Sequence, residues 1–201
     1  MGLTIRTFSP PSLPELSSPL SPSFKMRIVS GQYRGRHFDI PHSFKARPTT
    51  DFAKENLFNV LQGYVGFDGA AALDLFSGTG SITYELLSRG CDEVISVEAD
   101  RDHYAFIRQC LAKLGCLNVR AVRADVFRYL KHCRQQFDIV FADPPYALKQ
   151  LATLPEVVFE KSVLREGGVF VLEHGKDHSF QQHPRCFDHR QYGSVNFSFF
   201  R

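Results

Sequence analysis

Several features are scarce or missing in this chain, and each absence argues against a class of protein. No run of apolar residues approaches the length of a membrane-spanning helix. The five cysteines contain no Cys-x-x-Cys pair and no spacing typical of a metal site, so no bound metal is expected. Their odd number and scattered positions favour reduced, buried thiols in a cytoplasmic protein. The formal net charge of +3 permits a polyanionic partner without requiring one.

Residues 1–25 differ in composition from the rest of the chain. They are rich in serine and proline, and they lack the basic start and unbroken apolar core of a secretory signal. We therefore predict a disordered tail, with Met26 as a candidate natural start of translation. The rest divides into an N-terminal extension over residues 26–69 and a main domain over residues 70–201.

From residue 70 onward, predicted strands alternate with predicted helices. Apolar runs and glycine turns predict strands over residues 71–76, 93–99, 119–124, 137–142 and 169–174. Helices are expected over residues 82–89, 101–114, 125–133 and 149–164, with a C-terminal antiparallel hairpin over residues 187–200. This alternation is typical of a mostly parallel sheet covered by helices, which binds ligands at the carboxyl ends of its strands.

The extension over residues 26–69 combines a predicted hairpin with a helix that begins after Thr50. Four apolar side chains are expected on one face of this helix, packed against the main domain: Phe52, Leu57, Phe58 and Leu61. Gly63 is expected to end the helix. Cations cluster in the extension among aromatic residues, as in surfaces that contact phosphates and bases. A solvated charged face is the alternative.

The segment FDIVFADPPY, from Phe137 to Tyr146, places a carboxylate and an aromatic ring where a predicted strand ends. The two prolines stop regular pairing and favour extended geometry in the residues before them. Asp143 and the Pro144 carbonyl are suited to accept the hydrogens of a planar amino group, and the Tyr146 ring can stack on a flipped-out base. The alternative is an ordinary proline turn.

A second candidate site is the glycine-containing segment LDLFSGTG, residues 73–80. Thr83 stands where a dinucleotide-binding fingerprint needs its third glycine, which disfavours NAD. Asp74 beside such a loop suits a ligand that carries an ammonium group, as S-adenosylmethionine does.

The next two predicted strands also end in acidic residues. Glu98 is placed to accept hydrogen bonds from two ribose hydroxyls. Asp125 and the backbone amide of Val126 suit an adenine ring, although Asp125 could equally cap the following helix. Acids at the ends of four successive strands together predict one binding site.

These motifs carry a resemblance to known families. LDLFSGTG, VEAD, ADVF and DPPY resemble the motifs of Rossmann-like S-adenosylmethionine methyltransferases that modify amino nitrogens. MRIVSGQYRGR and RPTTDFAKENLFNVL resemble the N-terminal signature of the RsmD family, bacterial enzymes that make N2-methylguanine in small-subunit (16S) ribosomal RNA. The resemblance covers residues 26–201. It implies a class I α/β methyltransferase fold with a mostly parallel seven-stranded sheet, helices on both faces, a C-terminal antiparallel hairpin and a small N-terminal hairpin-plus-helix extension.

The resemblance also implies the site residues. It assigns catalysis to Asp143, Pro144, Pro145 and Tyr146, the last of which is Phe in many members. It assigns S-adenosylmethionine binding to the segment Asp74, Phe76, Ser77, Gly78, Thr79 and Gly80, and to Glu98, Ala99, Asp125 and Val126. It assigns RNA binding to Arg27, Arg34, Arg36 and Arg47.

The activity implied is direct in-line methyl transfer without a covalent enzyme intermediate. The implied partner is the RNA of assembled or partly assembled small ribosomal subunits, and the enzyme is expected to be a monomer. A DNA adenine-N6 methyltransferase is the main alternative, although residues 26–69 are a small module for reading DNA sequence. A non-catalytic RNA-binding protein is disfavoured because Asp74, Glu98 and Asp143 are all present. His174 is predicted either to cap the sheet or to line the substrate cleft.

Overall fold

The computed structural model describes residues 24–44 and 50–201. The predicted disordered tail lies outside the described residues except for Phe24 and Lys25, which belong to strand β1 (Phe24–Arg27). The tail prediction was therefore wrong for these two residues, because they pair with β2 (His37–Ile40) as the expected N-terminal hairpin. Within the described part of the chain, no helix is long and apolar enough to cross a bilayer.

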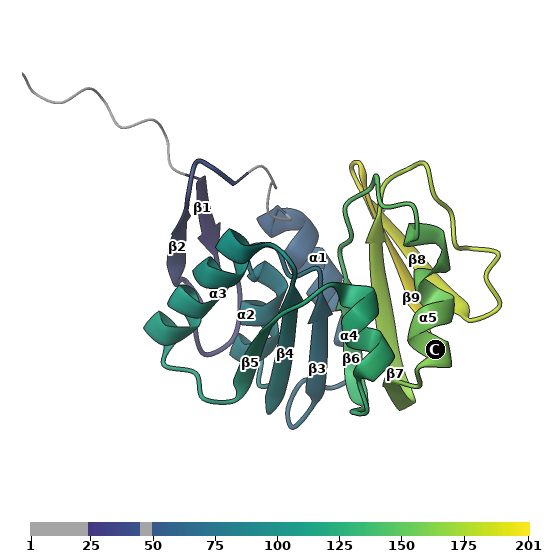
Figure 1. Cartoon of the computed structure of the whole chain (residues 1–201), viewed down its shortest axis with the longest axis horizontal. Coiled ribbons are helices and arrows are strands. Elements are labelled where there is room, and N and C mark those ends of the chain that lie inside the picture. The colour runs from purple at the N-terminus through teal and green to yellow at the C-terminus, as the bar shows by residue number, and fades with distance from the viewer. Residues whose placement is uncertain (1–23, 45–49) are drawn as a thin grey trace, which may run out of the picture.

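A seven-stranded sheet lies at the centre of the molecule, in the order β5-β4-β3-β6-β7-β9-β8 (Figure 1). Its parallel strands are β3 (Ala71–Leu75), β4 (Glu93–Glu98), β5 (Val119–Arg123), β6 (Phe137–Ala142) and β7 (Leu164–His174). The antiparallel hairpin β8 (Cys186–Tyr192) and β9 (Val195–Phe200) completes one edge. The chain thus has the class I methyltransferase fold, as predicted.

Helices cover both faces of this sheet, as Figure 1 shows. One face packs against α1 (Asp51–Leu61), α2 (Ser81–Ser88) and α3 (Arg101–Leu114). The other packs against α4 (Val126–His132), the 3-10 turn Leu151–Thr153 and α5 (Leu154–Glu160). The central parallel strands β3, β4 and β6 are buried on both sides, so their sequences are nearly continuous apolar runs, and the acidic residues at or just beyond their carboxyl ends form the site.

The N-terminal extension packs along α2. Lys54 of α1 is 1% exposed, and its Nζ lies 3.4 Å from a carboxylate oxygen of the fully buried Glu85. The same Nζ donates hydrogen bonds to the Arg27 carbonyl and to Ser81 Oγ. Because a buried ammonium is costly without such partners, this network holds the hairpin, α1 and the start of α2 in one arrangement.

Helix α1 begins and packs as expected, with one exception. Thr50 caps its N-terminus by accepting a hydrogen bond from Ala53 N. The last helical residue is Leu61, and Gln62 alone separates it from Gly63. Phe52 was predicted to be part of the packed face, but its side chain is 68% exposed and contacts Tyr192 edge to face. At 100° per residue, Phe52 points about 140° away from Leu57, so the helical period itself excludes it from the buried stripe.

The predicted helix over residues 149–164 was too long. Only a 3-10 turn and the seven-residue α5 form there, and Leu164 begins β7 opposite Phe137. Ser162 ends the helical region with a φ of 52°. Pairing with β6 therefore overrides the helical pattern at the C-terminal end of this segment.

The five cysteines are all unpaired. Cys91 and Cys110 are buried as predicted, but Cys116, Cys133 and Cys186 are partly exposed, so the prediction of buried thiols was wrong for these three. Burial raises the pKa of the Cys91 thiol to about 12 and that of Cys110 to about 11. Both side chains are therefore neutral core groups.

Candidate active site

Asp143 follows directly after β6, at the carboxyl edge of the sheet. Its backbone N–H donates to the Leu75 carbonyl at the end of the neighbouring strand β3, with 3.3 Å between the two atoms. Pro144 is buried, and Pro145 accepts a turn hydrogen bond from Leu148 N. The two prolines thus terminate the strand and keep Asp143 at a defined place beside β3.

The Tyr146 ring is held by residues at the end of the adjacent strand β7. Its hydroxyl donates to a carboxylate oxygen of Glu173 at 3.4 Å. A Cβ atom added to Gly175 would lie 2.9 Å from the ring, so the ring packs directly on backbone. Since 47% of Tyr146 remains exposed, the ring is fixed on one side and open on the other. Glu173 and Gly175 were not among the predicted site residues. Their position at the end of a predicted strand was the one feature of the sequence that pointed to them.

Asp74 and Asp143 form a pair of acids at neighbouring strand ends. Asp74 is 1% exposed and accepts a hydrogen bond from Thr83 Oγ1 at 2.5 Å. Burial raises the pKa of Asp74 to about 7, and the charge of Asp143 adds to the shift. Burial likewise raises the pKa of Asp143 to about 7. A pair of carboxyls that resists ionisation creates a strong local preference for a positively charged ligand.

Thr83 therefore has a role that the sequence reading missed. It was noted only because it replaces a glycine of the dinucleotide fingerprint. In the structure its hydroxyl orients the Asp74 carboxyl from the first turn of α2.

The loop between β3 and α2 is fastened by Glu98. One carboxylate oxygen of Glu98 accepts from Gly78 N and the other from Asp100 N, both at 2.7 Å. Ser77 Oγ donates to the Asp74 carbonyl at 2.8 Å. Phe76 adopts a φ of 58°, which is strained for a non-glycine residue and places the turn immediately beyond the strand. The strands β3 and β4 thus present a preformed backbone cradle.

Gly80 is the residue of this loop that tolerates a side chain least. Its φ is 81°, and a Cβ atom there would lie 2.5 Å from the Tyr84 hydroxyl and 3.1 Å from Ile107. We expect Gly80→Ala to lower the free energy of unfolding by about 1–3 kcal/mol and to weaken cofactor binding, because the loop must shift.

Thermal unfolding and calorimetric titration with S-adenosylmethionine check both effects. Gly66→Ala is the matched control, since its φ lies outside the left-handed range and an added Cβ atom would meet no heavy atom within 4 Å. Equal stability and equal cofactor affinity of the two variants would show that neither property depends on the geometry of the loop at Gly80.

Asp125 and Val126 lie at the start of α4. Asp125 caps the helix by accepting a hydrogen bond from Arg128 N at 2.9 Å. Helix capping, the predicted alternative to adenine binding, is therefore observed. Its carboxylate has a second oxygen, and the residue is exposed at the carboxyl end of β5. Val126 is buried, and Ala99 is the first residue after Glu98, which ends β4. The predicted adenine site therefore lies beside the predicted ribose site.

The structure does not bring all four predicted RNA-binding arginines together. Arg27 lies near the loop but forms an ion pair with Asp51 at 2.9 Å. Arg34 and Arg36 are exposed in a turn whose neighbour Gln32 donates to the Ser88 carbonyl at the far end of α2. An eight-residue helix, about 12 Å long, separates that end from Gly80. Arg47 lies outside the described residues.

His174 caps the buried end of β7 and does not line the cleft. It is fully buried, with Nδ1 3.0 Å from the Gly175 carbonyl and Nε2 2.9 Å from Ser198 Oγ. Since the carbonyl can only accept, Nδ1 carries the proton and Nε2 accepts from the Ser198 hydroxyl. Burial lowers the pKa of His174, so the ring is neutral.

Comparison with known proteins shows the family of this chain. Residues 26–201 match the sequence model of the family described as Conserved hypothetical protein 95, the RsmD family. The chain belongs to the RsmD family. Ribosomal RNA small subunit methyltransferase D of Haemophilus influenzae is 32% identical over 157 residues, which are 76% of this chain and 80% of that protein.

Solved structures extend this RsmD assignment. A hypothetical protein of Thermus thermophilus, TTHA0928, superposes with a TM-score of 0.77 and 28% identity, covering 87% of this chain and 98% of that one. The 16S rRNA N2 methyltransferase RsmC of Thermus thermophilus, in complex with AdoMet and guanosine, has a TM-score of 0.65 and 26% identity. The alignment covers 90% of this chain and 50% of RsmC.

S-adenosylmethionine is the cofactor of this RsmD-family protein. The residues present fit it, because the buried Asp74 carboxyl, with Asp143 as a second acid nearby, prefers a cation, and the backbone cradle has no side chain at Gly78 or Gly80. A pyrophosphate group would instead meet the carboxyl of Asp74. The chemistry of these donors thus agrees with the family.

Proposed function

We propose that this protein methylates the exocyclic N2 amino group of a guanine in small-subunit ribosomal RNA. Membership of the RsmD family and the H. influenzae relative support S-adenosylmethionine-dependent methylation of ribosomal RNA. The observation that carries the finer proposal is the end of β6. There, a carboxyl with a pKa raised to about 7 lies beside an exposed, anchored aromatic ring.

The cofactor is proposed to lie across the ends of β3, β4 and β5. Asp74 would face its ammonium group, Glu98 its ribose hydroxyls, and Asp125 with the Val126 amide its adenine ring. Phe76, Ser77, Gly78, Thr79, Gly80 and Ala99 would contact it through the loop and strand ends. When bound, S-adenosylmethionine supplies a methyl group already activated by a sulfonium, so the protein's task is mainly orientation and desolvation.

Asp143 and Pro144 are proposed to hold the amino group that is methylated. The Asp143 carboxylate and the Pro144 carbonyl each accept one N2 hydrogen, which directs the nitrogen lone pair away from them. As the nitrogen gains positive charge, the Asp143 carboxylate stabilises it and accepts its proton. A pKa of about 7 suits this role because the carboxyl is ionised in a sizeable fraction of molecules near neutral pH and is still basic enough to take a proton.

Tyr146 is proposed to stack on the target guanine. Glu173 and Gly175 hold one side of the ring, so the open face is available without further ordering of the side chain. Pro145 keeps the turn rigid. A base that stacks here must leave its own helix, which favours a guanine in a loop or bulge of the RNA.

The test is methyl transfer from labelled S-adenosylmethionine to small ribosomal subunits, and to their naked RNA, from a strain that lacks this gene. We expect label in N2-methylguanine after nuclease digestion of the RNA. Unmethylated DNA is the control acceptor. Label in N6-methyladenine of DNA, with none in either ribosomal acceptor, would replace this proposal with a DNA methyltransferase.

A further inference from the structure

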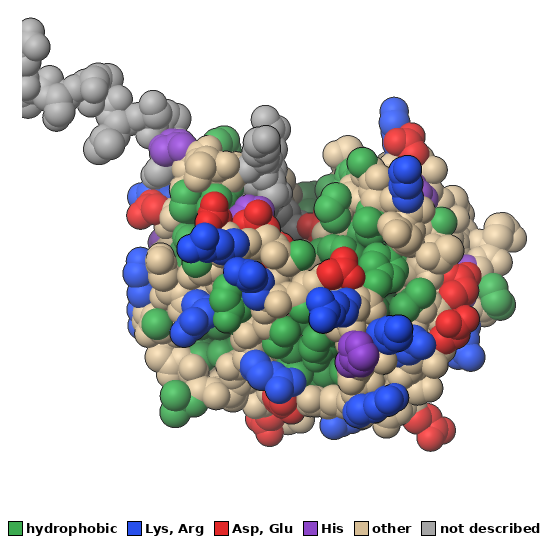
Figure 2. All heavy atoms as spheres, viewed as in Figure 1, with side chains coloured by type: hydrophobic (Ala, Val, Ile, Leu, Met, Phe, Trp, Pro, Cys, Tyr) green, Lys and Arg blue, Asp and Glu red, His purple; other side chains and the backbone are tan. Residues whose placement is uncertain are grey.

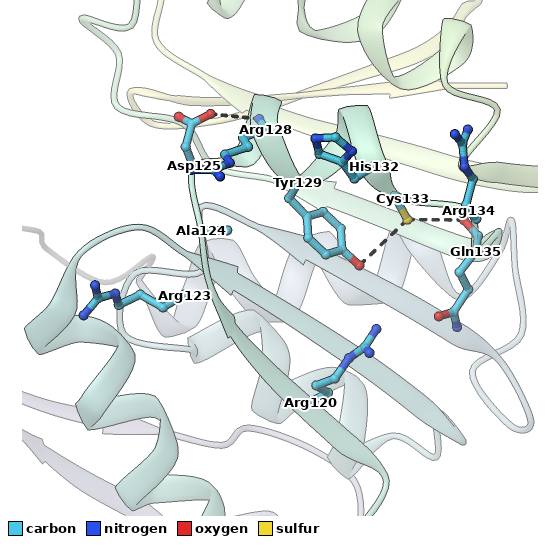
Figure 3. Close-up of a pocket in the computed structure, with 10 residues that line it drawn as sticks. All are labelled: Arg120, Arg123, Ala124, Asp125, Arg128, Tyr129, His132, Cys133, Arg134 and Gln135. Atoms are coloured by element: carbon cyan, nitrogen blue, oxygen red, sulfur yellow. Dashed lines mark hydrogen bonds between the residues drawn. The ribbon is translucent and has the colours of Figure 1, made fainter.

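A groove of about 720 Å³ lies between edge strand β5 and helix α4. It is lined by Arg120, Arg123, Ala124, Asp125, Arg128, Tyr129, His132, Cys133, Arg134 and Gln135. Figure 3 shows these side chains on β5, on α4 and on the residues that flank α4, with Asp125 and Arg128 at one end and Arg120 and Arg134 toward the other. None of its four arginines was among the residues predicted to bind RNA.

The charge of this groove is strongly unbalanced. Four arginines and one histidine line it, against a single carboxylate, Asp125. That carboxylate already accepts a backbone hydrogen bond from Arg128 N as the helix cap. Figure 2 shows basic side chains around an apolar area over β5 and α4, with few acidic ones among them. The groove therefore has a positive potential that a polyanion would neutralise.

The four groove arginines have no carboxylate in an ion pair with them, in contrast to several other arginines of the described chain. Arg27, Arg165 and Arg190 each form an ion pair of 2.9 Å or shorter with an aspartate. Across residues 24–44 and 50–201, no ion pair involves any arginine of the groove. All four are exposed. Their guanidinium groups thus retain donors in the fork geometry that matches phosphate oxygens.

The position of the groove connects it to the proposed active site. Asp125 belongs both to the groove and to the predicted adenine end of the cofactor site. From there the groove follows α4, a seven-residue helix about 10 Å long. This length suits a few nucleotides of one strand. The half-buried Tyr129 lies in the middle of the groove, where its ring adds an apolar surface between the cations.

We propose that the groove between β5 and α4 binds the sugar–phosphate backbone of the RNA substrate at nucleotides away from the target guanine. This inference rests on the proposed function. It assigns RNA contact to the α4 face of the sheet, whereas the N-terminal hairpin lies on the α2 face. The substrate would then pass over the carboxyl edge of the sheet and contact the protein on both sides of the active site.

The double variant Arg123→Ala/Arg134→Ala tests the groove. The side chains of Arg123 and Arg134 come from β5 and from the segment after α4, so one lies on each wall. Filter binding to naked 16S RNA and to small subunits at several salt concentrations should show a log K against log salt slope reduced by about 2. Affinity near 0.1 M salt should fall by about 10–50-fold. The dissociation constant for S-adenosylmethionine should not change.

The matched control is Arg108→Ala/Lys161→Ala, which removes the same charge from exposed positions on α3 and after α5. It should leave the slope at the wild-type value. An equal effect of both double variants would overturn the groove proposal, because only net charge would then matter. A loss confined to assembled subunits, when wild type binds naked RNA, would also overturn it and indicate an acidic protein partner.

The binding experiment and the methyl-transfer assay together separate this inference from the proposed function. If wild type methylates ribosomal RNA and the groove variant binds RNA with an unchanged slope, the groove proposal fails alone. If wild type binds RNA through the groove but transfers no methyl group to it, the proposed function fails and the groove remains an RNA site. If wild type binds no RNA, both fail.

Discussion

Asp143→Asn is expected to lower the rate of methyl transfer to small subunits by about 10²–10⁴-fold. The amide can still accept one hydrogen bond, but it cannot take a proton or carry the negative charge that stabilises the cationic nitrogen. The dissociation constant for S-adenosylmethionine should change by less than about tenfold, since Asp74 and Glu98 remain. Single-turnover kinetics and calorimetry measure the two effects separately.

The pH profile adds a second readout for Asp143. Its pKa is raised to about 7, so wild-type kcat/KM for RNA at saturating S-adenosylmethionine should fall tenfold per pH unit below about pH 6 as the Asp143 carboxyl becomes protonated. In Asp143→Asn, the part of this fall in kcat/KM that comes from protonation of Asp143 should disappear. Asp92→Asn, in the exposed turn before β4, is the control. It should keep the wild-type rate of methyl transfer and the wild-type fall of kcat/KM at low pH. Wild-type activity in Asp143→Asn would exclude the amino-group clamp.

Asp74→Asn is expected to weaken S-adenosylmethionine binding by about 100-fold or more while stabilising the ligand-free protein. The asparagine carbonyl can still accept from Thr83 Oγ1, so the loss is that of the negative charge. The wild-type carboxyl has a pKa of about 7 when folded, against a usual value near 3.8. Its contribution to stability is therefore present below about pH 4 and is lost as pH rises through 7.

At pH 8 the variant should be more stable than wild type by about 2–4 kcal/mol, a rise in Tm of about 5–10 °C. Near pH 4 the gap should nearly close, because Asp74 is then neutral in the folded wild type and only about half ionised in the unfolded chain. Thermal unfolding of both proteins from pH 4 to pH 8, without cofactor, measures it. A constant difference at all pH values, or tight cofactor binding by Asp74→Asn, would contradict this account.

The stability lost at Asp74 has a functional reading. An acid kept in the core only partly ionised is unfavourable in the empty protein, and a cationic ligand relieves that cost on binding. The fastening of the loop by Glu98 and of the N-terminal extension by Lys54 supplies the rigidity that holds this acid in place. Part of the binding specificity for a cation is thus stored as lower stability of the free protein.

Elements with a strong period and clear ends were predicted best. Helix α3 was expected over residues 101–114, and it forms over Arg101–Leu114 because Asp100 caps its start and Gly115 its end. The errors arose where local signals competed with packing. Phe52 was judged by its apolar character rather than by its angle on α1, and the end of the helix before β7 was decided by pairing with β6.

The sequence by itself determined the order of strands and helices and the position of each acid at a strand end, because caps, glycine turns and periodicity act between near neighbours in the chain. Its motifs also indicated the family. Only the tertiary structure decided which of these groups meet. Thr83 orients Asp74, Glu173 anchors Tyr146, and four exposed arginines from neighbouring segments line one groove. Burial, pKa shifts and unbalanced charge depend on distances between segments far apart in sequence, and the sheet sets those distances.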